Sequence, residues 1–309
     1  MKLGVIVCTH NRCESLKDTL QSLVSQDYPV SDYEVIVVDN CCTDKTKEIV
    51  AEFISQNPGE QSNVDIRYVM EEKLGLSHAR NRGIEEAKGE IIAFIDDDAK
   101  ADRFWLSRLT KVYSEEKDAA CVGGRVILDW NVNKPSWWEA ELDEVFNGIN
   151  YSDSKITLSY PHYPYGTNIS FRANILKKGG LFKTDLGRIG SKLLAGEETE
   201  LCLRIEKEGY KICYEPNAIV WHRVDPDKLS KSYIRKRAIW HGMSHALLEL
   251  KHFGPKHVKE RSIWHLRSIY RWLKRGQYNL VEQKRYLFEF GYFLQGMIKR
   301  PRHWFPGAY

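Results

Sequence analysis

The sequence predicts an α/β fold with a parallel sheet covered by helices on both faces, followed by a helical C-terminal extension. Short apolar runs alternate with helical patterns through the first 125 residues, and this alternation is typical of parallel sheets. Charge also divides the chain. Residues 226–309 hold 18 Lys and Arg against 5 Asp and Glu, whereas the whole chain has a net charge of +4. We therefore expect two parts, residues 1–225 and residues 226–309.

The first part begins with strands and helices in strict alternation. Apolar runs predict strands at 3–8, 33–39, 65–70, 90–95 and 119–127. Apolar residues three and four positions apart predict the intervening helices, at 16–24, 43–54, 77–87 and 102–113.

The remainder of the chain is less regular. Residues 130–165 have weak periodicity and many aromatic side chains, so we expect a long loop with one short helix. A strand and a helix follow at 166–176, then a helix at 196–209, and two short strands around a Pro-Asn turn at 210–222. In the extension, the spacing of apolar residues predicts three helices, at about 230–250, 257–275 and 279–299.

Composition excludes several classes of protein. No run approaches the roughly 18 apolar residues that a membrane span needs. The apolar run at the N-terminus is too short for a signal peptide, so we expect a cytoplasmic location. The seven cysteines are odd in number and lack metal-type pairs, so we expect free thiols.

Three carboxylates, Asp96, Asp97 and Asp98, follow the apolar run 91–95 without a gap. Like charges at a strand end repel one another unless a cation or several donors hold them. Mg²⁺ and Mn²⁺ prefer oxygen ligands and often complete their shells with phosphates. We therefore expect a divalent cation here, with a diphosphate as a further ligand. A solvated turn that caps the helix beginning at Asp102 is the alternative.

Polar residues also follow the other predicted strands, and the carboxyl ends of parallel strands border one crevice. Asp39 ends the second strand, where a carboxylate can bind a ribose or a base. The turn after the first strand, CTHNR, contains no glycine, which argues against an NAD site. A local helix cap is the alternative role for Asp39.

Six segments resemble, in order and spacing, the motifs of family 2 glycosyltransferases of the GT-A fold. They are VIVCTHNR, VIVVDNCCTD, KLGLSHARNRGI, IIAFIDDDA, YPYGTNISFR and LAGEETELCLRI, within residues 1–225. The resemblance implies a Rossmann-like mixed sheet with helices on both faces. It also implies inverting transfer of a sugar from a nucleoside-diphosphate sugar, a UDP-sugar in our interpretation, with Mn²⁺ or Mg²⁺ as cofactor. A glycan or lipid-linked acceptor is implied, in cell-surface polysaccharide or glycolipid synthesis.

The resemblance assigns roles to individual residues. Asp96 and Asp98 match the outer residues of the DXD motif, with Asp98 as the direct metal ligand. His222 falls where many such enzymes have a histidine near the metal, and a histidine bonded to a loop is its alternative. The residues expected to contact the nucleotide sugar are Thr9, Asn11, Arg12, Asp39, Lys73, Gly75, Arg80, Asp96, Asp97, Asn168 and Arg172, although Arg172 could instead pair with a surface acid.

The pair Glu197-Glu198 matches the acidic pair whose second member is the family's catalytic base, so Glu198 is our candidate. A helix dipole keeps a carboxylate at the helix start ionised, which suits a base at neutral pH. Asp is commoner than Glu at this position, and the extra methylene leaves the choice between Glu197 and Glu198 open. A solvated first turn that merely complements the dipole is the alternative.

The extension interleaves basic and aromatic residues. Lys and Arg attract anionic lipid, while Trp and Tyr lie at the headgroup level. We expect this part to bind the cytoplasmic face of a membrane near a lipid-linked acceptor; a helical cap or a homo-oligomer contact is the alternative. Nucleic acid is not expected, because no nucleic-acid motif is present.

Two other functions fit the residues less well. A nucleotidyltransferase of related architecture would carry a Gly-rich basic turn after the first strand, and CTHNR is not one. An inactive membrane-bound scaffold with the same fold would not need both the DXD motif and the acidic pair.

Overall fold

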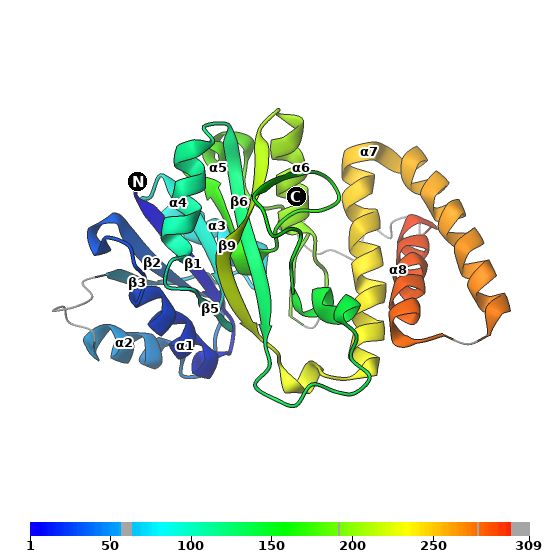
Figure 1. The fold of residues 1–309 in the computed structure, drawn as a ribbon, viewed down its shortest axis with the longest axis horizontal. Helices are drawn as coiled ribbons and strands as arrows, with labels where there is room; N and C mark the ends of the chain where they lie inside the picture. The colour runs from blue at the N-terminus through cyan, green and yellow to red at the C-terminus, as the bar shows by residue number, and fades with distance from the viewer. Residues whose placement is uncertain (57–63, 191, 277, 298–309) are drawn as a thin grey trace.

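The computed structural model describes residues 1–56, 64–190, 192–276 and 278–297. A nine-stranded mixed sheet forms the centre of the molecule, and helices cover both of its faces (Figure 1). The strands are β1 Leu3–Thr9, β2 Tyr33–Asp39, β3 Asp65–Met70, β4 Ile91–Asp96, β5 Ala99–Ala101, β6 Ala119–Asp129, β7 Ile156–Leu158, β8 Ile169–Arg172 and β9 Lys211–Arg223. The helices are α1 Cys13–Val24, α2 Thr46–Gln56, α3 Leu76–Glu86, α4 Trp105–Glu115, α5 Ala173–Gly179, α6 Glu197–Lys207, α7 Lys231–Arg275 and α8 Leu280–Met297.

The sheet has the order β3-β2-β1-β4-β8-β6-β9-β5, and β7 pairs with β9. The first four strands of this order are parallel, as the strand–helix alternation predicts. Strand β8 runs antiparallel between β4 and β6, so the sheet is mixed, as the family resemblance implies. The carboxyl ends of β1, β2 and β4 therefore lie at one edge of the sheet.

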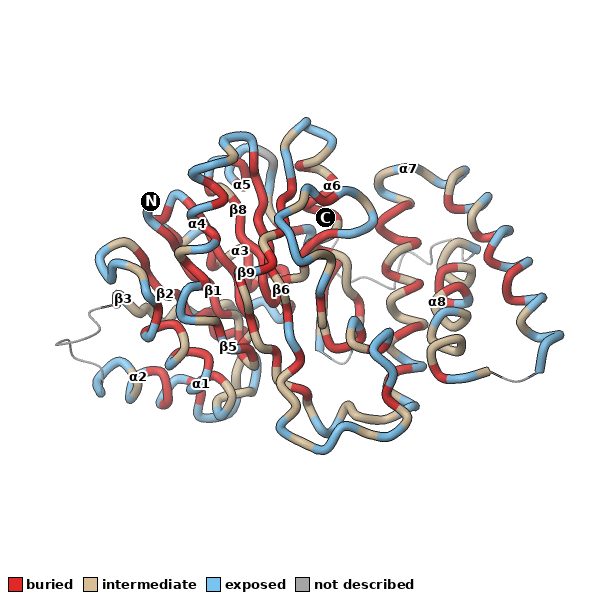
Figure 2. The backbone as a smooth tube through the Cα atoms, viewed as in Figure 1, coloured by how far each residue is buried: buried red, intermediate tan, exposed pale blue. Residues whose placement is uncertain are grey.

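Both faces of the sheet are buried (Figure 2). Successive side chains of a strand point to opposite faces, so Val5 and Val7 pack with α1, α2 and α4, while Ile6 packs with α3, α5 and α6. Burial on both faces explains why these strands read as continuous apolar runs.

Residues 210–222 and the loop 130–165 differ in part from what the sequence predicts. Residues 210–222 were expected to form two strands, whereas they form the single strand β9. Its pairing with β6 shifts from Gly124 opposite Glu215 to Val126 opposite Val220, so the Pro-Asn turn is absorbed as a bulge. The loop 130–165 contains the 3-10 helix Ala140–Phe146, as expected, and also the short strand β7.

The extension forms helices close to those expected. The first two predicted helices are halves of α7, and they meet at Gly254, which has a non-helical φ of 80° and precedes Pro255. Helix α8 follows the third prediction as far as Met297; residues 298 and 299 lie outside the described residues. The first half of α7 stands beside the sheet and its helices, with α8 beyond it (Figure 1).

All seven cysteines are free, as expected. Among the described helices, none is both long and apolar enough to cross a membrane.

The fully buried Glu249 connects both halves of α7 to their surroundings. Its carboxylate accepts hydrogen bonds from the hydroxyls of Tyr160 (2.7 Å) in the loop and Tyr292 (2.5 Å) on α8. It also pairs with Arg261, beyond the kink, at 2.5 Å. Burial by itself raises the pKa of Glu249, but these partners outweigh burial and lower it. The carboxylate therefore joins the extension to the rest of the fold.

We expect Glu249→Ala to lower the free energy of unfolding by about 2 to 4 kcal/mol, because it leaves two tyrosine hydroxyls and a guanidinium without their partner. Urea unfolding followed by circular dichroism measures this change. Glu260→Ala, which removes an exposed carboxylate from the same helix, is the matched control and should change stability by less than about 0.5 kcal/mol. Equal stabilities for the two variants would contradict the role of Glu249.

Candidate functional site

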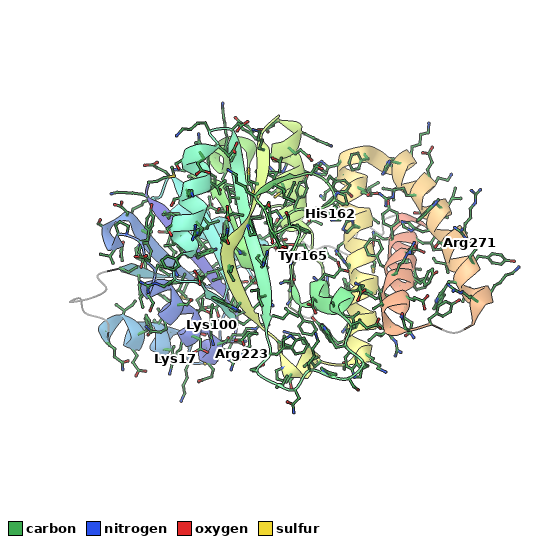
Figure 3. All side chains as sticks on the ribbon, viewed as in Figure 1. Lys17, Lys100, His162, Tyr165, Arg223 and Arg271 are labelled. Atoms are coloured by element: carbon green, nitrogen blue, oxygen red, sulfur yellow. The ribbon has the colours of Figure 1, made fainter. Side chains whose placement is uncertain are left out.

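A cavity of about 720 Å³ opens at the carboxyl ends of the parallel strands, within the size range of small-molecule sites. His162 and Tyr165, two of its lining residues, lie between the sheet and α7 (Figure 3). The predicted site residues that line it are Thr9, Arg12, Gly75, Arg80, Asp96, Asp97, Asp98, Glu197, Glu198 and His222. The structure thus brings together both acidic clusters that the sequence predicts.

Asn168 and Arg172 do not lie at this cavity, contrary to expectation. Asn168 is fully buried, where it accepts a hydrogen bond from the Trp105 indole (2.9 Å) and donates to the carbonyl of Ala218 (2.8 Å). Arg172 lies opposite Ile91 in the antiparallel pairing of β8 with β4, at the end of the strands that is remote from the cavity. Its guanidinium donates to backbone carbonyls, including that of Ala119 (2.8 Å), and not to a surface acid. Both residues therefore stabilise the sheet through these hydrogen bonds.

Asn11, Asp39 and Lys73 also lie outside the cavity lining. Both carboxylate oxygens of the buried Asp39 are occupied, by the Cys42 amide and the Tyr68 hydroxyl at 2.7 Å each. The Asn11 side chain accepts from the Thr43 amide at 2.7 Å, and Lys73 is exposed. Asp39 therefore has local structural contacts, but it does not cap α2, whose first residue, Thr46, donates its amide to Asp44 (3.1 Å).

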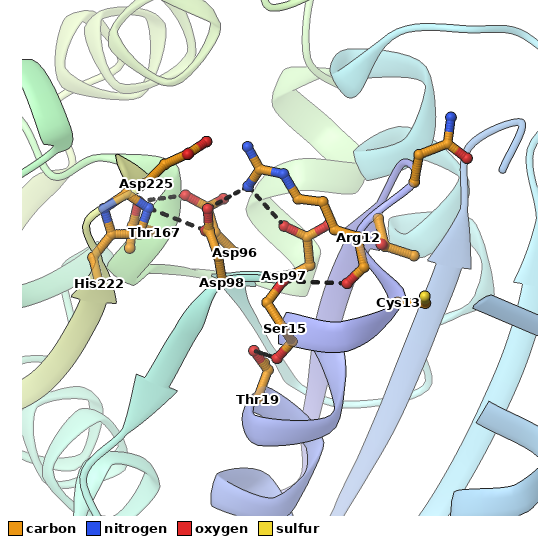
Figure 4. A network of polar contacts seen from close by, with 12 residues as sticks. Arg12, Cys13, Ser15, Thr19, Asp96, Asp97, Asp98, Thr167, His222 and Asp225 are labelled. Atoms are coloured by element: carbon orange, nitrogen blue, oxygen red, sulfur yellow. Dashed lines mark hydrogen bonds and ion pairs between the residues drawn. The ribbon is translucent and has the colours of Figure 1, made fainter. Parts of the chain in front are cut away.

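Asp96, Asp98 and His222 converge at one side of the cavity (Figure 4). One ligand atom from each lies within 4.8 Å of the other two. Asp96 also accepts a hydrogen bond from Thr167, and Arg12 forms ion pairs with both Asp97 and Asp98. Three side chains of metal-binding type are thus held together by neighbours that fix the carboxylates.

The hydrogen bonds of His222 favour a cation at this point. Its Nδ1 lies 2.7 Å from the carbonyl of Phe146, so this nitrogen must donate. In a neutral ring, Nε2 then carries a lone pair, and it lies 3.1 Å from an oxygen of Asp98. Two acceptors facing each other require either a proton or a metal ion between them. The donor set fits a divalent cation that accepts both carboxylate and imidazole ligands.

The pKa values of the neighbours Asp97 and Asp98 are shifted in opposite directions. Burial raises the pKa of Asp97 to about 7. Burial acts on Asp98 as well, but His222, when a proton rather than a metal ion lies between the two, and Arg12 outweigh it and lower the pKa of Asp98. The outer residue is therefore the anionic one, which suits a metal ligand.

Arg80, from α3, holds the second acidic cluster together. Its Nη1 lies 2.9 Å from an oxygen of Glu197 and 2.9 Å from one of Glu198, at the start of α6. Glu198 also accepts from the Gly166 amide at 3.1 Å. A Cβ at Gly166 would lie 1.8 Å from Arg80 Nη2, so only glycine permits this close approach.

The two glutamates have different environments. The Glu198 side chain is 14% exposed and that of Glu197 is 3% exposed. Burial raises the pKa of Glu198, but the charge of Arg80 and hydrogen bonds from Arg80 and Gly166 outweigh it, so the net shift is downward. Burial and the charge of Glu198 raise the pKa of Glu197 to about 7. Glu198 is thus the ionised carboxylate with access to the cavity.

Several lining residues were not predicted. Asn40 donates to the carbonyl of Lys73 (2.8 Å) and accepts from the Gly75 amide (2.8 Å), which fixes the turn before α3. Helix α7 contributes Tyr233, Arg237, His241 and His245 to the cavity wall. Their spacing of four residues places them on one helical face. That spacing is visible in the sequence and was the available signal.

Comparisons with known proteins agree on one family. The family model described as "Glycosyl transferase family 2" matches residues 4–180. A glucosyl-dolichyl phosphate glucuronosyltransferase of Haloferax volcanii is 31% identical over 259 residues, 81% of this chain and 78% of that protein. The succinoglycan biosynthesis protein ExoM of Rhizobium meliloti is 28% identical over 257 residues, 80% of this chain and 75% of that protein.

Solved structures show the same fold. The mannosyltransferase PcManGT from Pyrobaculum calidifontis, in complex with GDP-Man and Mn²⁺, has a TM-score of 0.59 at 21% identity, covering 94% of this chain and 69% of that one. Residues 1–349 of TarS from S. aureus give a TM-score of 0.55 at 18% identity, covering 97% of this chain and 93% of that one. Both are glycosyltransferases of the GT-A fold.

The raised pKa of Glu197 predicts a pH-dependent effect of Glu197→Gln. Between its ordinary pKa of 4.5 and about 7, the folded state binds more protons at this residue than the unfolded state does. This contribution to stability is therefore lost as the pH rises through that range. Relative to the wild type, Glu197→Gln should become more stable by about 1 to 3 kcal/mol between pH 5 and pH 8.

Urea unfolding at both pH values measures this difference. Glu208→Gln, at an exposed position just beyond α6, is the control and should show no such trend. A pH-independent difference for Glu197→Gln would show that Glu197 is ionised throughout.

Proposed function

The chain belongs to glycosyl transferase family 2, and on this premise we propose that it is a metal-dependent, inverting enzyme that uses a nucleoside-diphosphate sugar, specifically a UDP-sugar. The observation that carries the proposal is the cavity shared by the Asp96–Asp98–His222 cluster and the ionised Glu198. Membership of this family argues against the alternative that the chain is a nucleotidyltransferase.

Asp96, Asp98 and His222 are the residues that would hold the metal. Mg²⁺ prefers oxygen ligands, whereas an imidazole in the set suits Mn²⁺ better. When bound, the ion supplies Lewis-acid stabilisation of the charge on the departing diphosphate. Arg12, which already pairs with Asp97 and Asp98, adds a positive charge at the same place.

Glu198 is the proposed base. The acceptor hydroxyl attacks the anomeric carbon, its proton passes to the Glu198 carboxylate, and the bond to the diphosphate breaks on the opposite face. One such displacement inverts the anomeric centre. Arg80 and the Gly166 amide position the carboxylate before the acceptor binds, so little reorganisation is needed during the reaction.

A glycan or a lipid-linked molecule in cell-surface polysaccharide or glycolipid synthesis is the proposed acceptor. Two relatives support this class, since the name of one contains a dolichyl phosphate and that of the other succinoglycan biosynthesis.

The second half of α7 supports docking on an anionic membrane by the proposed second part, residues 226–309. Ile263, Leu266, Tyr270 and Leu273 are between 43% and 67% exposed, although their spacing gives one apolar face. Basic side chains flank this face, and Arg271 lies at the outer end of the molecule (Figure 3). Apolar residues beside Lys and Arg are typical of helices that lie on a membrane surface.

The enzymatic proposal predicts distinct defects in two variants. Glu198→Gln should retain Mn²⁺ and UDP binding but lower turnover by about a hundredfold or more, because it removes the base. Asp98→Asn should weaken Mn²⁺ binding and with it the Mn²⁺-dependent turnover. UDP release from a panel of UDP-sugars, with Mn²⁺ titrated, measures turnover, and calorimetry measures binding.

Glu208→Gln and Asp27→Asn remove exposed carboxylates and should behave as the wild type. Full turnover in Asp98→Asn would remove this residue from the site. Loss of turnover in Glu197→Gln but not in Glu198→Gln would assign the base to Glu197. No UDP release from any donor in the wild type would favour the inactive scaffold.

The docking proposal predicts that the double variant Leu266→Ser/Leu273→Ser partitions at least about tenfold less into phosphatidylserine vesicles. Co-sedimentation measures the partition. Met70→Ser changes a residue that is 55% exposed elsewhere on the surface, and it should leave the partition unchanged. If the wild type does not bind vesicles but forms dimers, and the double variant does not form dimers, this face is a homo-oligomer contact.

A further inference from the structure

The cavity is lined by basic residues as well as by the two acidic clusters. Arg188 comes from the segment between α5 and α6, Arg237, His241 and His245 from α7, and Lys284 from α8, and all five line the cavity. Burial lowers the pKa of His245 to about 4 and that of His241 well below its ordinary value. The charge of the wall at neutral pH therefore comes from the arginines and the lysine.

Arg188 and Arg237 are not neutralised by the protein. Arg237 is half-buried and donates to the carbonyl of Leu193 at 2.8 Å. Within the described part of the chain, neither guanidinium lies within 4.0 Å of a carboxylate oxygen. Burial lowers the pKa of Arg237, and the nearby charge of Arg188 lowers it further. Two half-buried cations therefore repel each other.

The nearby carboxylates already have other partners. Glu197 and Glu198 both pair with Arg80, and Glu144 pairs with Lys284. The two arginines thus differ from Arg80 and Arg12, each of which holds carboxylates. An uncompensated pair of cations costs stability, and such an arrangement is typical of a site that binds an anion.

We propose that Arg188 and Arg237 bind a phosphate group of the acceptor, so that the acceptor is a phosphate ester. The forked guanidinium matches phosphate oxygens, and two positive charges match a phosphate better than a single carboxylate. The assignment to the acceptor rests on the proposed function. Arg188 and Arg237 line the same cavity as Glu198, so an anion bound by them shares that cavity with the proposed base, where the acceptor must be.

The test is the affinity for inorganic phosphate, measured by calorimetry at constant ionic strength with UDP and Mg²⁺ present to fill the donor site. Arg188→Gln and Arg237→Gln should each bind phosphate roughly tenfold more weakly than the wild type, because each loses a charged hydrogen-bond donor. Arg235→Gln is the matched control, since Arg235 is exposed on the same helix and bonds to Gln283. It should bind phosphate as the wild type does.

Equal phosphate affinity in the wild type and Arg237→Gln would overturn the proposal. Tighter binding of D-glucuronate than of phosphate, lost in the same variants, would also overturn it by assigning a carboxylate. Thermal unfolding checks that the variants fold; removing one of two repelling cations should leave the unfolding temperature unchanged or higher. Arg237→Lys keeps the positive charge but lacks the forked guanidinium, so it should bind phosphate with intermediate affinity. This variant decides the test if Arg237→Gln does not fold.

The same titrations separate this site from the proposed function. In one outcome, the wild type does not bind UDP, but the two variants still bind phosphate more weakly than the wild type when UDP is omitted. This outcome would remove the donor assignment and retain the anion site. UDP binding without any phosphate difference would retain the donor assignment and remove the anion site.

Discussion

The candidate site depends on two arginines that hold carboxylates together. Arg12 pairs with Asp97 and Asp98, and Arg80 pairs with Glu197 and Glu198. Without these cations the carboxylates would repel one another in a partly buried space. Arg12 precedes α1, in the turn after β1, and Arg80 lies on α3, so both arginines are held by elements next to the parallel strands. The charges needed for the chemistry are therefore in place before substrate binds.

The parallel strands and the position of the acidic clusters could be predicted because both follow from local patterns. Apolar runs mark the strands, and the rule that ligands bind at the carboxyl ends places Asp96 and Asp98 at the cavity. Strand β8 shows the limit of such patterns. Its antiparallel direction takes Arg172 to the far edge of the sheet, and direction depends on pairing with β4 and β6, which is not encoded within the segment itself.

The wall formed by α7 could not be predicted from the extension alone. The sequence predicts the helix and places Arg237, His241 and His245 on one face, but a helical pattern does not say which surface that face meets. The apolar positions of the second half illustrate the same limit. Ile263 and Leu273 have the spacing of a packed face and yet are exposed. Composition also does not reveal that α7 contacts the rest of the fold through Glu249 and contributes to the cavity lining.

The basic residues of the cavity lining that α7 and α8 contribute lie outside the part of the chain that the family model matches. The family match ends at residue 180, whereas Arg188, Arg237, His245 and Lys284 all follow it. Gly166 meets Arg80 and Glu198, two residues of the cavity lining, so closely that a larger side chain has no room. Under the proposed function, substitutions on α7 and α8 change the anion that the cavity accepts without changing Asp96, Asp98 or Arg80, which lie within the family match. Enzymes with nearly identical motifs can in this way serve unrelated biosynthetic routes.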